Sequence, residues 1–177
     1  LPGSRAPRGA WDDGPVTAPV NPRILGLEAR FTDLGSQDPP WIAVRSQTNA
    51  DGREAHVWER WIAFSVEPLY LALFARWDPG MIVRGHGHHS PHTLLVLEGG
   101  VTCDGVECGP GTHIELPHGA SFGPFVAGPD GLVAYEVMMG DPRSWSDEPE
   151  EMASALDAHG ADRRPVLRRV HPEDPQV

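Results

Sequence analysis

The chain has 177 residues and a formal net charge of -11, from 25 acidic and 14 basic side chains. This length suits one domain of ordinary size, and the excess of negative charge opposes binding to nucleic acid or to an anionic membrane. All 14 basic side chains are arginine, which excludes Schiff-base chemistry on a lysine and a phosphate-binding lysine.

The expected cellular compartment follows from the lack of membrane and signal patterns in the sequence and from its two cysteines. No apolar run approaches the ~20 residues of a membrane helix, and the N-terminus has no basic-then-apolar signal pattern. Cys103 and Cys108 flank Asp104-Gly105, a strong signal for a type I′ hairpin turn. That turn makes the cysteines diagonal neighbours, so we expect two reduced thiols. We therefore expect a cytoplasmic protein.

The N-terminal part has weak patterning. Residues 1–22 are rich in proline, glycine and alanine and are expected to form a flexible arm. Residues 23–68 are expected to form an N-terminal extension that packs on a barrel. Within it, the pattern over 23–38 allows a helix or a strand, whereas apolar runs predict strands over 41–44 and 56–66.

From Leu69 the pattern changes to short strands separated by glycine and proline. The expected strands cover residues 69–77, 82–88, 93–97, 101–103, 106–108, 113–116, 121–126 and 132–139. Such spacing argues for an antiparallel sandwich or barrel, which we assign to residues 69–142. The remainder, 143–177, is expected to hold a short helix from Glu148 to His159 and a tail.

Four of the nine histidines lie within seven residues of one another. His86 and His88 alternate along an extended segment, so both side chains project from the same face. Ser90-Pro91 predicts a turn, after which His92 can return to that face on the next strand. Neutral imidazole is the commonest protein ligand for divalent transition metals. The pattern therefore predicts a metal site of three histidines, with His89 pointing away.

The same stretch resembles the first motif of the cupin family. That motif is a glycine, five residues, His-x-His, three or four residues, a glutamate, six residues and a glycine. The chain matches it at every spacing with Gly80, His86, His88 and Gly99, and it has His92 in place of the glutamate.

The second cupin motif is matched in its glycines and proline but not in its ligand. Gly111, Pro117 and Gly119 fall at the expected spacings, whereas Phe122 replaces the histidine and Val126 replaces the asparagine. The resemblance covers about residues 69 to 139. It implies an all-β fold, the double-stranded β-helix or jelly-roll barrel of cupins, here with an N-terminal extension and a short C-terminal helix.

The resemblance also implies a bound divalent metal, with Fe(II) as the first choice and manganese, nickel or zinc as alternatives. The ligands would be His86, His88 and His92, a neutral set that leaves coordination positions open for a substrate and dioxygen. We expect a mononuclear non-haem iron dioxygenase that acts on a small oxygenated or aromatic organic substrate. The alternatives are a metal-assisted lyase or isomerase, and a cupin that binds or senses a small molecule without turnover.

Further candidates follow from strand alternation. Glu136 lies in an otherwise apolar strand and is the first choice for a catalytic carboxylate, while Arg84, Phe122 and Tyr135 are candidates for substrate binding. The alternatives for a fourth ligand or a base are His113, His118, Glu98 and Glu115. A homodimer is an expectation from the family.

Overall fold

The computed structural model describes residues 30–145 and 166–167, all of them in strands, turns or irregular segments. The strands are β1 (Ile42–Thr48), β2 (Glu54–Val66), β3 (Leu69–Trp77), β4 (Ile82–Val83), β5 (Gly87–His88), β6 (His92–Cys103), β7 (Val106–Cys108), β8 (His113–Leu116), β9 (Phe125–Met138), β10 (Ser144–Trp145) and β11 (Val166–Leu167). The arm expected over 1–22 and the helix expected over 148–159 lie outside the described residues. Among those described, no helix is long and apolar enough to cross a membrane.

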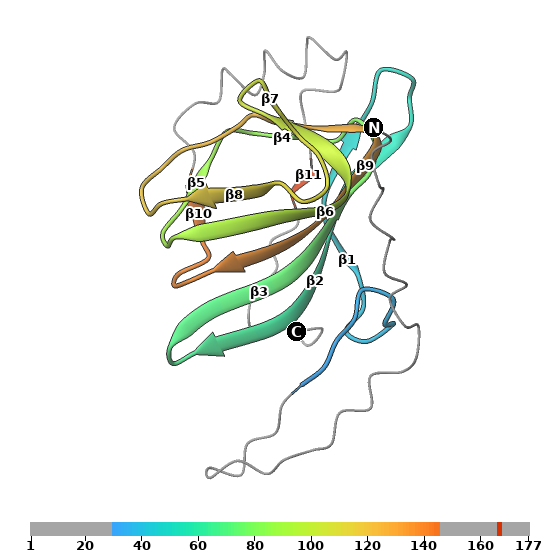
Figure 1. The fold of residues 1–177 in the computed structure, drawn as a ribbon. Helices are drawn as coiled ribbons and strands as arrows, with labels where there is room; N and C mark the ends of the chain where they lie inside the picture. Colours follow the sequence, from blue (N-terminus) through green and yellow to red (C-terminus); the bar gives the residue numbers. More distant parts are fainter. Residues whose placement is uncertain (1–29, 146–165, 168–177) are drawn as a thin grey trace, which may run out of the picture. The chain divides into compact units, whose positions relative to one another are not determined.

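The chain divides into two compact units, Leu1–Asp33 and Leu34–Val177, and every strand belongs to the second. Nine strands of that unit form one antiparallel sheet in the order β11-β1-β2-β3-β9-β6-β7, with β4 paired to β9 and β8 paired to β6 (Figure 1). Strands β5 and β10 form a separate antiparallel pair. The prediction of an all-β antiparallel fold is confirmed.

Three strands have the predicted bounds, namely β3, β7 and β8. Elsewhere the predicted pieces join, since 93–97 and 101–103 are both part of β6, and 121–126 and 132–139 both contribute to β9. Glycines between these pieces indicated breaks, but the chain continues through them with shifts in the pairing of β6 with β9. The predicted strand over 82–88 is divided into β4 and β5.

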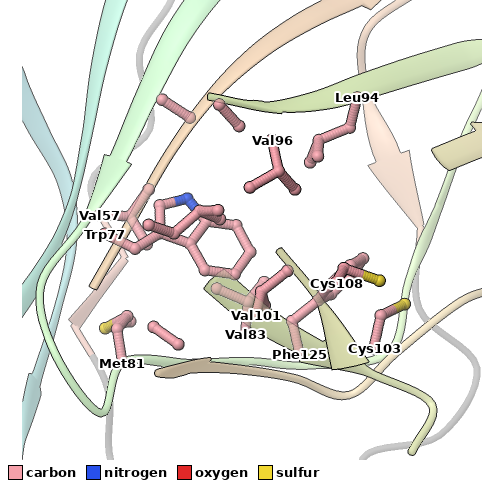
Figure 2. Close-up of a cluster of buried hydrophobic side chains, with 14 of the residues drawn as sticks. Val57, Trp77, Met81, Val83, Leu94, Val96, Val101, Cys103, Cys108 and Phe125 are labelled. Atoms are coloured by element: carbon pink, nitrogen blue, oxygen red, sulfur yellow. The ribbon is translucent and has the colours of Figure 1, made fainter. Parts of the chain in front are cut away.

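One face of the nine-stranded sheet, here called the inner face, carries the core. The alternation along β3 places Leu73, Ala75 and Trp77 on this face, and all three are buried. Figure 2 shows Trp77 close to Phe125, and the two rings meet edge to face with centroids 5.6 Å apart. Edge-to-face pairs of this kind add about 0.5–1.5 kcal/mol to the burial itself.

The hairpin between β6 and β7 has the predicted geometry. Asp104 and Gly105 both have positive φ, 48° and 76°, as a type I′ turn requires. Val101 is opposite Cys108 and Cys103 is opposite Val106, so the predicted register is confirmed. Both thiols are free and buried, and burial raises the pKa of Cys103 to about 11.

Gly99 of β6 and Gly131 of β9 lie in close contact near the end of β3, and a first prediction concerns Gly99. A Cβ on Gly99 would lie 2.1 Å from the carbonyl oxygen of Gly131, and Gly99 also has φ +65°. We expect Gly99→Ala to lower the free energy of unfolding by about 3 kcal/mol or more, because positive-φ strain and a backbone clash add. Denaturant unfolding measures this difference.

Two matched glycines separate the strain from the clash. Gly111 has φ +88° with open space around it, so Gly111→Ala is expected to cost only about 1 kcal/mol. Gly109 has neither feature, so Gly109→Ala is expected to stay within about 0.5 kcal/mol. Equal losses at Gly99 and Gly111 would show that the close approach of β6 and β9 is not tight.

Candidate functional site

The three histidines predicted as metal ligands come together in the structure. His88 ends β5, His92 begins β6, and His86 forms an isolated antiparallel bridge with Phe122. The ring centroids of His86 and His88 are 5.1 Å apart, and those of His88 and His92 are 4.8 Å apart. The turn at Ser90-Pro91 therefore returns the chain to the same place, as the sequence predicts.

Backbone carbonyls fix the tautomers of His86 and His88. The Nδ1 atoms lie 2.8 Å from the carbonyl oxygens of Arg84 and Pro142, respectively. A carbonyl only accepts, so each Nδ1 carries the proton and the neutral ring presents a bare Nε2. Burial is the main cause that lowers the pKa of both rings, to about 3 for His86, so the neutral form dominates at physiological pH.

His92 is held in the opposite way. Its Nε2 lies 3.1 Å from Oε2 of Glu136, and both residues are buried, at 3% and 7% exposure. A carboxylate oxygen accepts, so Nε2 of His92 donates to Glu136 and Nδ1 is the nitrogen left with a lone pair. That Nδ1 is buried and has no hydrogen-bond partner in the described residues. Each of the three imidazoles is thus anchored through one nitrogen.

Phe122 contacts all three imidazoles. The centroid of its ring lies 4.8, 6.4 and 6.0 Å from those of His86, His88 and His92. Behind it, Phe125 belongs to the apolar core, so Phe122 joins the histidines to that core. Phe122 therefore forms an apolar wall against the three histidines.

Gly87 allows two other segments of the chain to pack closely beside His88. A Cβ on Gly87 would lie 2.4 Å from both the ring of Trp145 and the carbonyl oxygen of Ala120. Trp145 pairs with Gly87 across β10 and β5, and its indole N–H points at the carbonyl oxygen of His88 at 3.4 Å. Only glycine permits this approach, which fixes the backbone between the two histidines.

The donors of this cluster fit a divalent transition metal in their chemistry. Two imidazoles that bind one ion at about 2.1 Å have ring centroids roughly 5 Å apart for N–metal–N angles between 90° and 110°. The two measured separations have this size. As placed, however, no group of three or more histidine, cysteine, aspartate or glutamate side chains in the described residues has the arrangement of a complete metal site.

A charged row continues from the histidines along the inner face. The register places Arg45 beside Val57, Glu59 beside Ala75, and Glu136 beside Leu73, so all three project to the inner face. Trp61 donates its indole N–H to Oε2 of Glu59 at 2.7 Å. Burial raises the pKa of Glu59 to about 7 and, with the charge of Arg84, lowers that of Arg45 to about 10.

Of the other candidates from the sequence, Arg84 adjoins the histidine cluster and the rest lie away from it. Tyr135 is on the opposite face of β9 from Glu136, where its ring packs against Phe74 at 5.8 Å, so the structure does not bring it to the histidines. Arg84 lies between β4 and His86 and accepts the His86 hydrogen bond through its carbonyl. The four alternatives for a ligand or a base are exposed, namely His113, His118, Glu98 and Glu115, and His89, which we expected to point away, is exposed as well.

Sequence reasoning missed Arg45, Glu59 and Trp145. Glu59 had a usable signal, because it alternates with Val57 and Trp61 along one strand and therefore shares their buried face. Arg45 had none, because a bulge between Ala43 and Arg45 reverses the alternation. Trp145 depends on the β10–β5 pairing, which lies far apart in sequence.

Comparison with solved structures shows similar folds. An acetylacetone dioxygenase from Acinetobacter johnsonii is 13% identical, with 74% of this chain and 94% of that chain covered and a TM-score of 0.50. A cupin-like protein from Thermotoga maritima is 18% identical over 70% and 90% of the two chains, with a TM-score of 0.47. KdgF from Halomonas sp. is 26% identical over 49% and 79%, with a TM-score of 0.38.

No family model and no curated protein sequence matches the chain. At 13% identity the likeness to the dioxygenase concerns the fold and not the chemistry.

Proposed function

We propose that this chain, which has a cupin-like fold, is a metal-dependent cupin enzyme, and specifically a mononuclear non-haem Fe(II) dioxygenase acting on a small oxygenated organic substrate. One observation supports the proposal: His86 and His88 are both neutral and both anchored through Nδ1, so each has a bare Nε2, and their ring centroids are 5.1 Å apart. Anchoring a ligand histidine through its second nitrogen is the usual support of a metal site. The sheet would form the jelly-roll barrel of cupins around this cluster.

In this proposal His86, His88 and His92 hold the metal. Bound iron would supply dioxygen activation and would polarise the oxygen atoms of the substrate. A neutral ligand set leaves the charge of the dication uncompensated, which favours an anionic or enolised substrate. Manganese, nickel or zinc remain alternative ions, because all of them accept imidazole.

The other side chains of the cluster have separate tasks. Phe122 lies against all three rings and excludes water from one side of the site. Glu136 orients His92 through the 3.1 Å contact at Nε2, which leaves Nδ1 as the nitrogen that would hold a metal, and the other carboxylate oxygen would hold a substrate proton. Glu136 is thus a positioning residue first.

A second candidate function is supported by Glu59. A carboxyl group whose pKa is raised to about 7 by burial is suited to general acid and base catalysis at neutral pH. With the metal polarising a carbonyl group, such an acid would support lyase or isomerase chemistry without dioxygen. Glu59 lies on the same inner face as Glu136, and the charge of Glu136 contributes to the raised pKa.

Anaerobic reconstitution with Fe(II) tests the proposal. We expect about one iron per chain, and oxygen uptake with pentane-2,4-dione or related β-diketones and hydroxyketones. The His86→Ala/His88→Ala/His92→Ala variant is expected to lose both. A triple variant that keeps its iron would reject the site. Stoichiometric iron without oxygen uptake across the panel would reject the dioxygenase and favour the lyase or a binding protein.

A further inference from the structure

Arg45 is a half-buried residue whose positive charge has no ion-pair partner among the described residues. Its Nη1 atom is buried without a hydrogen-bond partner, and its side chain forms no ion pair within 4.0 Å in the part of the chain that the structure describes. Glu59 is the acid whose charge acts on Arg45, but the indole of Trp61 occupies its Oε2. A guanidinium group left in this state costs free energy, which calls for a missing partner.

The position of Arg45 connects it to the histidine cluster. Its register with Val57 places it on the inner face, where its charge contributes to the lowered pKa of His86 and the charge of Arg84 contributes to its own lowered pKa. Arg84 likewise has no ion pair among the described residues. Two like charges near each other repel, and a bound anion relieves that repulsion. A guanidinium group matches a carboxylate with two parallel hydrogen bonds.

We propose that Arg45, assisted by Arg84, binds a carboxylate group of the substrate, so that the substrate class is a small oxygenated carboxylate whose other oxygen atoms face the histidines. The identity of the reaction rests on the proposed function, whereas the anion site rests on the two arginines alone. Arg45 is a substrate-binding residue in this scheme.

A matched pair of probes tests the site. Pentane-2,4-dione and 2,4-dioxopentanoate share the β-dicarbonyl group, and only the second carries a carboxylate. Calorimetric titration of the full chain, both metal-free and loaded with redox-inert Zn(II), measures the two affinities. We expect 2,4-dioxopentanoate to bind at least about tenfold more tightly, the range of one charge-assisted pair.

Variants assign the preference to the arginine. Arg45→Met is expected to bring the two affinities within about twofold of each other by weakening the binding of 2,4-dioxopentanoate, and urea unfolding reports whether the variant is folded. Arg45→Lys is expected to keep an intermediate preference, since it keeps the charge but loses the two parallel hydrogen bonds. The control is Arg53→Met, because Arg53 is exposed and pairs with Asp51. No preference in the unmodified chain, or a preference that survives Arg45→Met, overturns the proposal.

The experiments distinguish failure of the Arg45 site from failure of the proposed metal-dependent function. A carboxylate preference in a chain whose metal content does not depend on His88 would reject the metal site and retain the Arg45 site. Oxygen uptake with pentane-2,4-dione by a chain without any carboxylate preference would reject the Arg45 site and retain the dioxygenase.

Discussion

If the proposed metal site is right, replacing His88 by alanine is expected to lower the metal affinity of the chain by at least about 100-fold, because His88 is a direct ligand in that site and loss of such a ligand exceeds the 10–100-fold typical of outer partners. His86→Ala is expected to have the same effect, since the two rings are anchored alike through Nδ1. Metal analysis after dialysis against a graded series of chelator concentrations measures the change. A loss of this size corresponds to about 2.7 kcal/mol or more.

Exposed histidines provide the controls. His89 and His113 are both exposed, and we expect His89→Ala and His113→Ala to keep the full metal content. His89 is the sharper control because it adjoins His88 in the sequence. If His89→Ala loses the metal and His88→Ala keeps it, the predicted alternation of this segment is wrong in solution.

The second prediction adds an imidazole to the proposed metal site, at Phe122. This residue pairs with His86 across the isolated bridge, and its ring lies near all three imidazoles. We expect Phe122→His to raise the metal affinity about tenfold or more by adding a fourth imidazole. An unchanged affinity would mean that the metal binds away from Phe122, and it would contradict the proposed site at the three histidines.

Much of this arrangement could be predicted from local patterns. Alternation and turn chemistry predicted β3, the Asp104-Gly105 hairpin and the convergence of His86, His88 and His92, because each depends on residues close in sequence. The glycines at 99 and 131 misled the strand prediction, since a glycine can end a strand or permit a close crossing. Only the contact between Gly99 and Gly131 distinguishes the two cases.

The charged part of the site could not be predicted in full, for a different reason. Which face Arg45 occupies depends on a bulge in β1, and the neighbours of Glu59 depend on the sheet order β2-β3-β9. Both are tertiary features without a local signal. Tyr135 is a second example. Alternation along β9 predicts that Tyr135 and Glu136 lie on opposite faces, but it does not predict which of these faces is the inner one.

The pH dependence of stability should report the two buried groups with opposite signs. His86 has an unfolded pKa of 6.5 and a native pKa of about 3, so between these values only the unfolded state is protonated and stability rises with pH. Glu59 has an unfolded pKa of 4.5 and a native pKa of about 7, so between these values only the native state is protonated and stability falls with pH. From pH 4.5 to 6.5 the two contributions oppose each other.

Two variants separate these contributions in metal-free protein. Removing the acid with Glu59→Gln leaves the histidine contribution unopposed, so we expect stability to fall on acidification from pH 6.5 to 4.5 by about 1 kcal/mol per pH unit more than in the unmodified chain. His86→Gln is expected to shift the slope by a similar amount in the opposite sense. Both values allow for partial solvent screening of half-buried side chains.

Urea unfolding at half-unit pH intervals in the presence of chelator measures these slopes. The exposed pairs Arg53–Asp51 and Arg143–Asp141 are present in every variant, so their contributions cancel in the comparison. Parallel curves for Glu59→Gln and the unmodified chain would mean that Glu59 is ionised in the native state, and the lyase alternative would then lose its acid. Curves that diverge in opposite directions would establish that this face of the sheet holds a neutral imidazole and a neutral carboxyl group together, the state in which it would meet an anionic substrate.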